Sequence, residues 1–173
     1  MKRIVFFSIF ILSVQWLYGQ DNYPVPTEKK DLLFYIQHNR GKNTFVYSLR
    51  RNKNKAIDLQ EPVQVYRQLF DNDGEIRGLT AMQKNFAYGI NQKKMPNGAY
   101  ELSIVSIPSQ KLYLHLPRVG LPYVSSTING KQMRVDRIFI QIKDGTSGLG
   151  TKLDYIQFYG TIKNQAVQQK LVL

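Results

Sequence analysis

Short runs of alternating apolar and polar residues recur from residue 31 to the end of the chain, with turn-forming residues between them. A two-residue period of this kind is typical of half-buried β-strands. Most connections are too short to hold a crossover helix, so neighbouring strands should be antiparallel. The pattern predicts an all-β, mainly antiparallel fold, a β-sandwich or a partly closed barrel of about nine strands with one short helix. The predicted strands span residues 32–37, 44–49, 61–70, 100–107, 111–116, 121–128, 132–143, 153–162 and 166–173.

The clearest pair of runs is a predicted β-hairpin over residues 31–49, DLLFYIQHNRGKNTFVYSL. Aromatic and β-branched residues, which favour strands, fill both of its halves. Residues 38–43 between them, HNRGKN, supply Asn and Gly for a turn and two positive charges, Arg40 and Lys42. We therefore expect a rigid hairpin with a basic, hydrogen-bonding tip.

One segment changes period. Between residues 79 and 90 the apolar side chains, Met82 and Phe86 among them, recur every three or four positions, which predicts a short helix packed against a sheet. Thr80 is the expected N-cap and Gly89 the expected stop.

The connections are polar. Residues 50–55 (RRNKNK) and 91–98 (NQKKMPNG) are predicted basic loops, and residues 71–74 (DNDG) a turn. The glycine content of residues 145–150 is similar to that of a phosphate-binding loop, but no Gly-Lys-Ser/Thr follows, so we interpret it as a hairpin connection.

The first 19 residues have the pattern of a secretory signal peptide. Lys2 and Arg3 precede an apolar segment over residues 4–17, and Gly19 offers a small residue before a cleavage site. The alternative is a transmembrane anchor, but the apolar segment is shorter than the roughly 20 residues that a spanning helix needs. We expect an exported protein, periplasmic or extracellular, cleaved after Gly19 or one residue later, with no transmembrane segment in the mature chain.

After cleavage, residues 20–30 should form an extended lead-in, because they contain Pro24 and Pro26. Residues 31–173 are long enough for a single β-rich domain with its own core. The chain has no Cys, which excludes a Cys nucleophile and a thiolate metal site.

The charge is strongly positive. The chain has 24 Lys and Arg against 12 Asp and Glu, and removal of Lys2 and Arg3 with the signal leaves 22 against 12, a net charge of +10. Such a field attracts anions. For an exported protein the expected polyanions are lipids or glycans of the cell envelope rather than nucleic acid. The alternative is a solvated basic surface with no partner.

Catalytic signatures are weak. His38 and His115 have no second His or carboxylate at metal-ligand spacing, and no Gly-x-Ser-x-Gly motif is present. Asp71 and Asp73 fit a turn and lack the spacing of a 12-residue calcium loop. We predict no cofactor, no metal and no enzymatic activity.

Many of the tyrosines lie in the predicted strands, where an aromatic ring and a polar hydroxyl are combined in one side chain. Tyr35 shares a strand face with Gln37, and Tyr155 with Gln157. A sheet face or barrel mouth lined by Tyr, Gln, Asn and Arg suits a ligand with a polar head, such as a lipid or a sugar. The alternative is that these tyrosines are strand residues at the margins of the core.

Three motifs in order, LFYIQHNRGKNTFVY (33–47), EPVQVYRQLFDNDG (61–74) and LTAMQKNFAYGI (79–90), resemble the bacterial family of exported proteins numbered 4833 among the domains of unknown function. The chain departs from the family pattern at His38, where the family often has Arg, and at Arg67, where it often has Trp. The family supplies no activity to carry over. The positions that match its pattern are Tyr35, Gln37, Asn43, Thr44, Tyr47, Glu61, Tyr66, Gln83, Phe86, Tyr88 and Gly89.

These observations predict a non-enzymatic, exported protein that binds an anionic or polar-headed envelope component. One alternative is a structural or accessory subunit of an envelope complex that docks through a sheet edge or basic face, and another is a hydrolase with an unrecognised acid pair. The polar matching residues are equally consistent with an internal hydrogen-bond network between hairpin and helix. Arg40, Lys42 and Arg50 are expected to attract the ligand, and the predicted binding residues are Tyr35, Gln37, Arg40, Asn43, Thr44, Tyr47, Tyr66, Gln83 and Tyr88.

Overall fold

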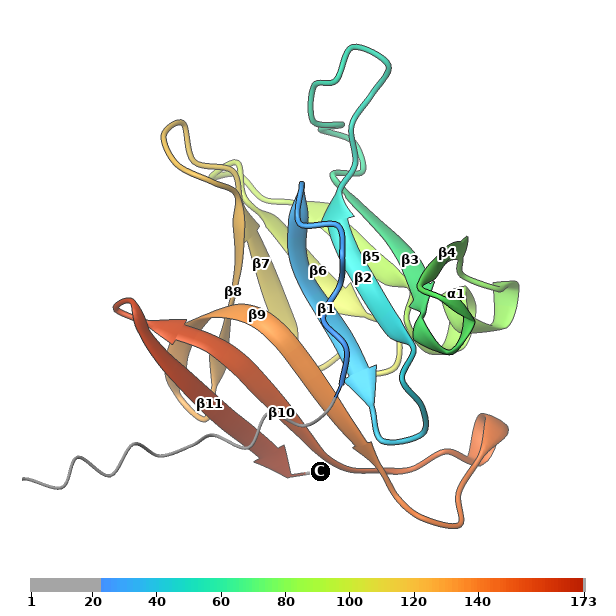
Figure 1. The fold of residues 1–173 in the computed structure, drawn as a ribbon. Helices are drawn as coiled ribbons and strands as arrows, with labels where there is room; N and C mark the ends of the chain where they lie inside the picture. The colour runs from blue at the N-terminus through green and yellow to red at the C-terminus, as the bar shows by residue number, and fades with distance from the viewer. Residues whose placement is uncertain (1–22, 173) are drawn as a thin grey trace, which may run out of the picture.

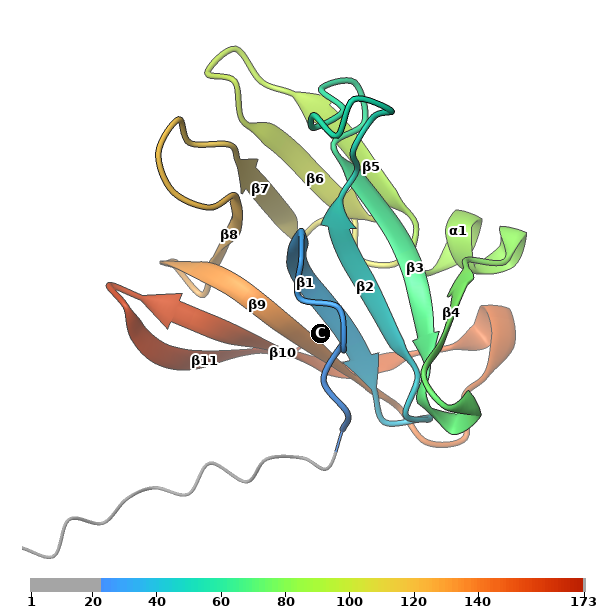
Figure 2. The ribbon, with the colours of Figure 1, turned by 45° about the horizontal axis from the view of Figure 1, so that its top comes forward.

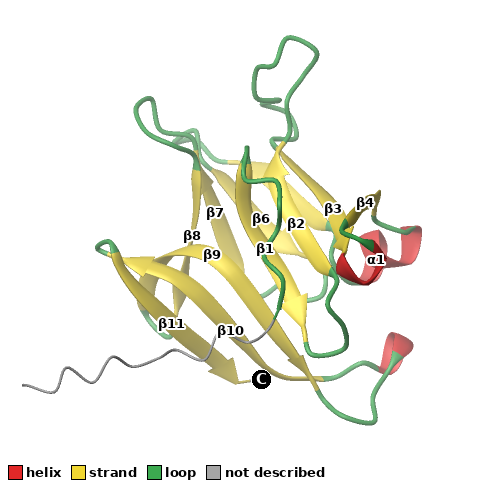
Figure 3. Ribbon diagram, in the orientation of Figure 1, coloured by secondary structure: helices red, strands yellow, loops and turns green. Residues whose placement is uncertain are grey.

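The computed structural model describes residues 23–172 of the chain (Figure 1). The predicted signal peptide and its cleavage site lie outside the described residues. Strands make up most of the molecule (Figure 3). In chain order the elements are β1 (Leu32–His38), β2 (Thr44–Leu49), β3 (Val63–Leu69), η1 (Phe70–Asn72), β4 (Glu75–Gly78), α1 (Ala81–Phe86), β5 (Ile90–Lys94), β6 (Tyr100–Ile104), β7 (Lys111–His115), β8 (Tyr123–Ile128), β9 (Lys131–Ile142), η2 (Gly148–Gly150), β10 (Leu153–Ile162) and β11 (Gln165–Val172).

All nine predicted strands are present, close to their expected bounds. Two further strands, β4 and β5, were not expected. The prediction of a loop over residues 91–98 is wrong in its first half, because β5 pairs there with β6 from Ile90 opposite Ile104 to Lys94 opposite Tyr100. Backbone pairing with a neighbour, rather than the polar side chains of β5, sets this strand.

The predicted helix is real but shorter. Thr80 caps α1 through a capping box, in which Thr80 Oγ1 accepts from Gln83 N at 3.2 Å and Gln83 Oε1 accepts from Thr80 N at 3.1 Å. The expectation that Met82 and Phe86 pack against the sheet is wrong, since they are 63% and 62% exposed. The helix has only six residues, and it is the flanking Leu79, Tyr88 and Ile90 that contact the core.

β9 joins the two halves of the sheet. Its first residues, 131–134, pair with β8, and residues 137–140 pair with β1, the one parallel pair of the described sheet. β10 follows the opposite edge of β9, and β11 pairs with β10. The strand order is therefore β4-β3-β2-β1-β9-β8-β7-β6-β5, with β10 and β11 branching from β9.

The nine strands of this path curl into a half-barrel, as expected for a partly closed barrel (Figures 1 and 2). β3 and β5 meet at its seam without backbone pairing. The side chain of Gln92 in β5 bridges them, because its Oε1 accepts from Val63 N and its Nε2 donates to Val63 O, both at 2.9 Å. Two tyrosine hydroxyls also join distant parts of the chain. Tyr47 Oη donates to Tyr88 O at 2.8 Å, and Tyr100 Oη donates to Leu59 O at 2.6 Å.

The core lies inside the half-barrel, where the alternating apolar side chains converge. Phe34 and Tyr47 are fully buried and stack with their ring centroids 4.3 Å apart. The lead-in, described from residue 23, covers the outer face of β1–β3 instead. Gln37 Nε2 donates to Pro24 O at 2.7 Å, so this outer face is also closed to solvent at the centre of the sheet.

Candidate functional site

The predicted binding residues do not converge on one site. Gln37 and Thr44 lie on the outer face, where Gln37 Nε2 donates to Thr44 Oγ1 at 2.9 Å and to the lead-in. Tyr35 and Tyr66 are half-buried on the outer faces of β1 and β3. Burial raises the pKa of both phenols, with a smaller effect of neighbouring charges. The hydrogen bonds of Gln37 are internal, but they join the two strands of the hairpin to each other and to the lead-in, and not to the helix.

Tyr47 and Tyr88 belong to the interior. Tyr47 is fully buried, and burial raises the pKa of its phenol well above the ordinary value. The ring of Tyr88 stacks on Phe45 with centroids 3.4 Å apart and lies 6.1 Å from the ring of His38. The hydroxyl of Tyr47 donates to Tyr88 O, and Tyr47 offers no surface to a ligand. Tyr88, in contrast, forms part of a pocket wall.

That pocket opens at the end of the half-barrel between α1 and the β9–β10 connection, with a volume of about 450 Å³. Its size falls in the range of small-molecule sites, roughly 300–1,000 Å³. Of the cavities in the described residues, we take this one as the candidate site because large apolar side chains form most of its wall. They are Met82, Phe86, Tyr88, Ile140, Ile142 and Leu153, and the lining also includes Ala87, Gly148 and the polar residues Gln83, Ser106 and Thr151.

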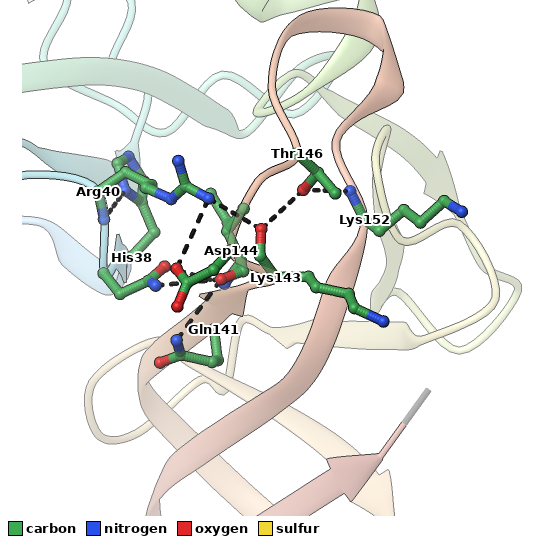
Figure 4. Close-up of polar contacts among 9 residues, drawn as sticks. His38, Arg40, Gln141, Lys143, Asp144, Thr146 and Lys152 are labelled. Atoms are coloured by element: carbon green, nitrogen blue, oxygen red, sulfur yellow. Dashed lines mark hydrogen bonds and ion pairs between the residues drawn. The ribbon is translucent and has the colours of Figure 1, made fainter.

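The basic hairpin tip is hydrogen-bonded to the end of β9 and to the connection that follows it (Figure 4), and Ile142 at that end also lines the pocket. Asn39 extends the sheet with its side chain, since Nδ2 donates to Ile142 O at 3.1 Å and Oδ1 accepts from Ile142 N at 2.9 Å. Arg40 Nη2 donates to Lys143 O at 2.8 Å and lies 3.8 Å from a carboxylate oxygen of Asp144, which is 99% exposed. The tip is thus fixed to the residues that follow β9, and the side chains of Lys143 and Lys152 extend from the same connection.

Three other predicted residues have separate positions. Gln83 caps α1 and also lines the pocket. The Oδ1 atom of Asn43 is buried and has no hydrogen-bond partner among the described residues. Arg50, expected to act with Arg40 and Lys42, instead follows the far end of β2 and forms an ion pair with Glu61.

The burial of His38 should make the stability of the fold depend on pH. Its ring lies beside Phe45 and Tyr88, and burial, with the nearby charge of Arg40, lowers its pKa below the ordinary value of 6.5. The unfolded chain therefore binds the proton more readily, and stability is full above about pH 6.5 and falls as the pH drops through the folded-state pKa. His115, whose Nε2 lies 2.8 Å from Ser125 Oγ across two strands, has a pKa lowered by burial too.

We expect His38→Gln to flatten the loss of stability between pH 7.5 and pH 5, because the glutamine takes up no proton in either state. Urea midpoints of the wild type and the variant at several pH values measure the slope. His115→Gln is the matched variant, and we expect a smaller change from it because His115 is less enclosed. An unchanged slope in His38→Gln would contradict the assignment.

Two other kinds of feature are absent from the part of the chain that the structure describes. Within residues 23–172 no group of three or more His, Asp or Glu side chains gathers closely enough to hold a metal ion. Nor is any helix in that range both long and apolar enough to cross a membrane.

Comparison with known proteins gives a family. The model of the family described as a domain of unknown function, DUF4833, matches residues 34–170. No curated protein and no solved structure matches the chain. The matched region begins inside β1 and ends inside β11, so it contains the half-barrel, the seam and every wall of the apolar pocket. The chain belongs to the DUF4833 family.

Proposed function

We propose that this protein is an exported, non-enzymatic binding protein for an anionic, polar-headed lipid of the cell envelope. The observation that carries the proposal is the apolar pocket at the end of the half-barrel. A pocket with an apolar wall and few polar groups suits a hydrocarbon chain better than a sugar. The predicted signal peptide and the net positive charge support an exported protein with an anionic ligand.

The polar head would lie at the rim of the pocket. Lys143 directly follows the lining residue Ile142, and Lys152 lies between Thr151 and Leu153, which also line it. Both lysines are exposed. Lysine binds phosphate and carboxylate groups as a point charge, without a fixed geometry, which fits a head group at a solvated rim.

Blocking the pocket should weaken binding. Ser106 lines the pocket, is exposed, and donates or accepts no side-chain hydrogen bond among the described contacts. We expect Ser106→Trp to fill the space and weaken the binding of a dansyl-labelled undecanoic acid by about tenfold or more, about 1.4 kcal/mol. Dansyl emission, which rises when the probe leaves water, measures the affinity.

The control is Ser109→Trp, an exposed position in the same β6–β7 connection that does not line the pocket. It should bind the probe as the wild type does. Equal affinity in Ser106→Trp and the wild type, or an equal loss in both variants, would remove the pocket from the proposal.

A second candidate function is an accessory subunit of an envelope complex. Among the described residues no strand other than β10 pairs with β11; Asn129 Nδ2 donates to Lys170 O at 2.9 Å, and Val172 near the end of the strand is 71% exposed. An edge without a paired strand can accept a strand from another chain. Cross-linking through Lys170 in the native envelope tests this candidate: a specific protein adduct supports it, and the absence of any adduct opposes it.

A further inference from the structure

We propose that the mouth of the apolar pocket docks on an anionic phospholipid bilayer, with Met82 and Phe86 of α1 entering the interface. This inference rests on the proposed function and deepens it, because it names the surface from which the ligand enters. It is carried by exposed apolar side chains, by cations across the pocket from them and by the position of the pocket.

The apolar residues are displayed on a fixed support. Met82 and Phe86 lie four positions apart in α1, hence on one face of the helix, and more than three-fifths of each is exposed. The helix is capped by the capping box at Thr80, and the residues after it are tied to the β6–β7 connection, because Ser106 N donates to Ala87 O at 3.1 Å and Val105 N to Gly89 O at 2.9 Å. Exposed apolar side chains on a rigid element are typical of a surface that meets an apolar partner.

Cations lie across the pocket from this apolar pair. Lys143 and Lys152 extend from the connection that forms the opposite wall of the pocket. Both are exposed, and among the described residues neither joins an ion pair. Two exposed acids lie next to these lysines in the sequence: Asp144, which Arg40 faces at 3.8 Å, and Asp154, two positions after Lys152.

This combination favours a bilayer over a second protein. Apolar side chains that insert among acyl chains, with lysines at the level of the head groups, are the pattern of interfacial binding. α1 and the β9–β10 connection lie at the same end of the molecule in both views (Figures 1 and 2). Docking there turns the pocket toward the membrane, so a lipid chain enters without crossing water.

A second exposed apolar pair provides a matched control. Val119 and Leu121, in the β7–β8 connection, are 90% and 79% exposed but do not line the apolar pocket. If exposure alone caused membrane binding, this pair would contribute more than α1.

The test is co-sedimentation with vesicles of phosphatidylcholine containing phosphatidylglycerol, compared with phosphatidylcholine alone. We expect the wild type to bind the anionic vesicles and to release them at high salt. The affinity of Met82→Ser/Phe86→Ser for these vesicles should fall by about tenfold or more, because the variant buries less apolar surface in the interface. Lys143→Gln/Lys152→Gln should lose roughly fivefold per lysine. Val119→Ser/Leu121→Ser should sediment like the wild type, and circular dichroism checks that each variant is folded.

The outcomes separate the two proposals. A wild type that binds the dansyl probe but no anionic vesicle overturns docking and leaves the pocket function in place. A wild type that binds vesicles without binding the probe overturns the pocket function. Equal binding to both vesicle types, or a loss in the Val119 and Leu121 control as large as in the α1 variant, also overturns docking through this surface.

Discussion

Replacing Gly160 with alanine should destabilise the domain by about 3 kcal/mol or more. An added Cβ at this position would lie 1.8 Å from Arg134 O and 3.2 Å from Val135 Cα. Both atoms belong to the backbone of β9, so no side-chain rotation relieves the overlap. Gly160 marks the place where the register of β10 on β9 shifts, just before β9 passes from β8 to β1. The two halves of the sheet therefore depend on this contact.

Gly78→Ala is the matched substitution. Gly78 also lies in a strand, β4, but an added Cβ there meets no atom within 4 Å. We expect its stability to stay within about 0.5 kcal/mol of the wild type, as for most surface substitutions. Urea unfolding followed by circular dichroism measures both variants. If Gly160→Ala unfolds at the wild-type midpoint, β10 does not approach β9 as closely as the structure shows.

The strands that are buried on one face could be predicted from the sequence. In β9, Ile138 and Ile140 turn into the core and Arg137 turns outward, which is the alternation that the residues show. β1 and β2 were equally clear, because aromatic and β-branched residues are concentrated on either side of an Asn–Gly turn region. A period of two is a local property of the chain, so it needs no knowledge of tertiary neighbours.

The closure of the fold could not be predicted in the same way. β5 carries Asn91, Lys93 and Lys94 and has little apolar pattern, and it is a strand because β6 pairs with it. The parallel contact of β1 with β9 joins residues about a hundred positions apart, as Tyr35 opposite Arg137 shows. Both features depend on which elements meet in space, and no local pattern specifies that.

The candidate site shows the same division. The helical period around Met82 and Phe86 predicted an amphipathic helix. The period does not determine whether the apolar face of that helix packs against a sheet or lines the mouth of a pocket. Composition marked the tyrosines, yet Tyr47 is buried in the core and Tyr66 is half-buried on the outer face of β3. Burial decides between packing and binding, and it depends on the assembled sheet.

The second large effect on stability is expected at the seam between β3 and β5. We expect Gln92→Glu to cost about 2–4 kcal/mol at neutral pH, although the two side chains have nearly the same shape. The carboxylate still accepts from Val63 N, but it cannot donate to Val63 O, so two acceptors would face each other where a 2.9 Å bond now lies. A half-buried acceptor that has no donor loses the hydrogen bond, and the free-energy cost of removing it from water is no longer compensated.

The pH dependence of this variant identifies the cause. Protonation lets the introduced carboxyl donate to Val63 O, so the fold favours the protonated form and raises the folded-state pKa of that carboxyl above its unfolded value. The deficit relative to the wild type should therefore shrink as the pH falls through the folded-state pKa toward the unfolded value, and return as the pH rises. Gln132→Glu, at an exposed position of β9, should show no such recovery. Parallel urea midpoints for the two variants from pH 7 to pH 4 decide the matter, because a pH-independent deficit in Gln92→Glu would mean that packing, and not the amide bridge between β5 and β3, holds the half-barrel closed.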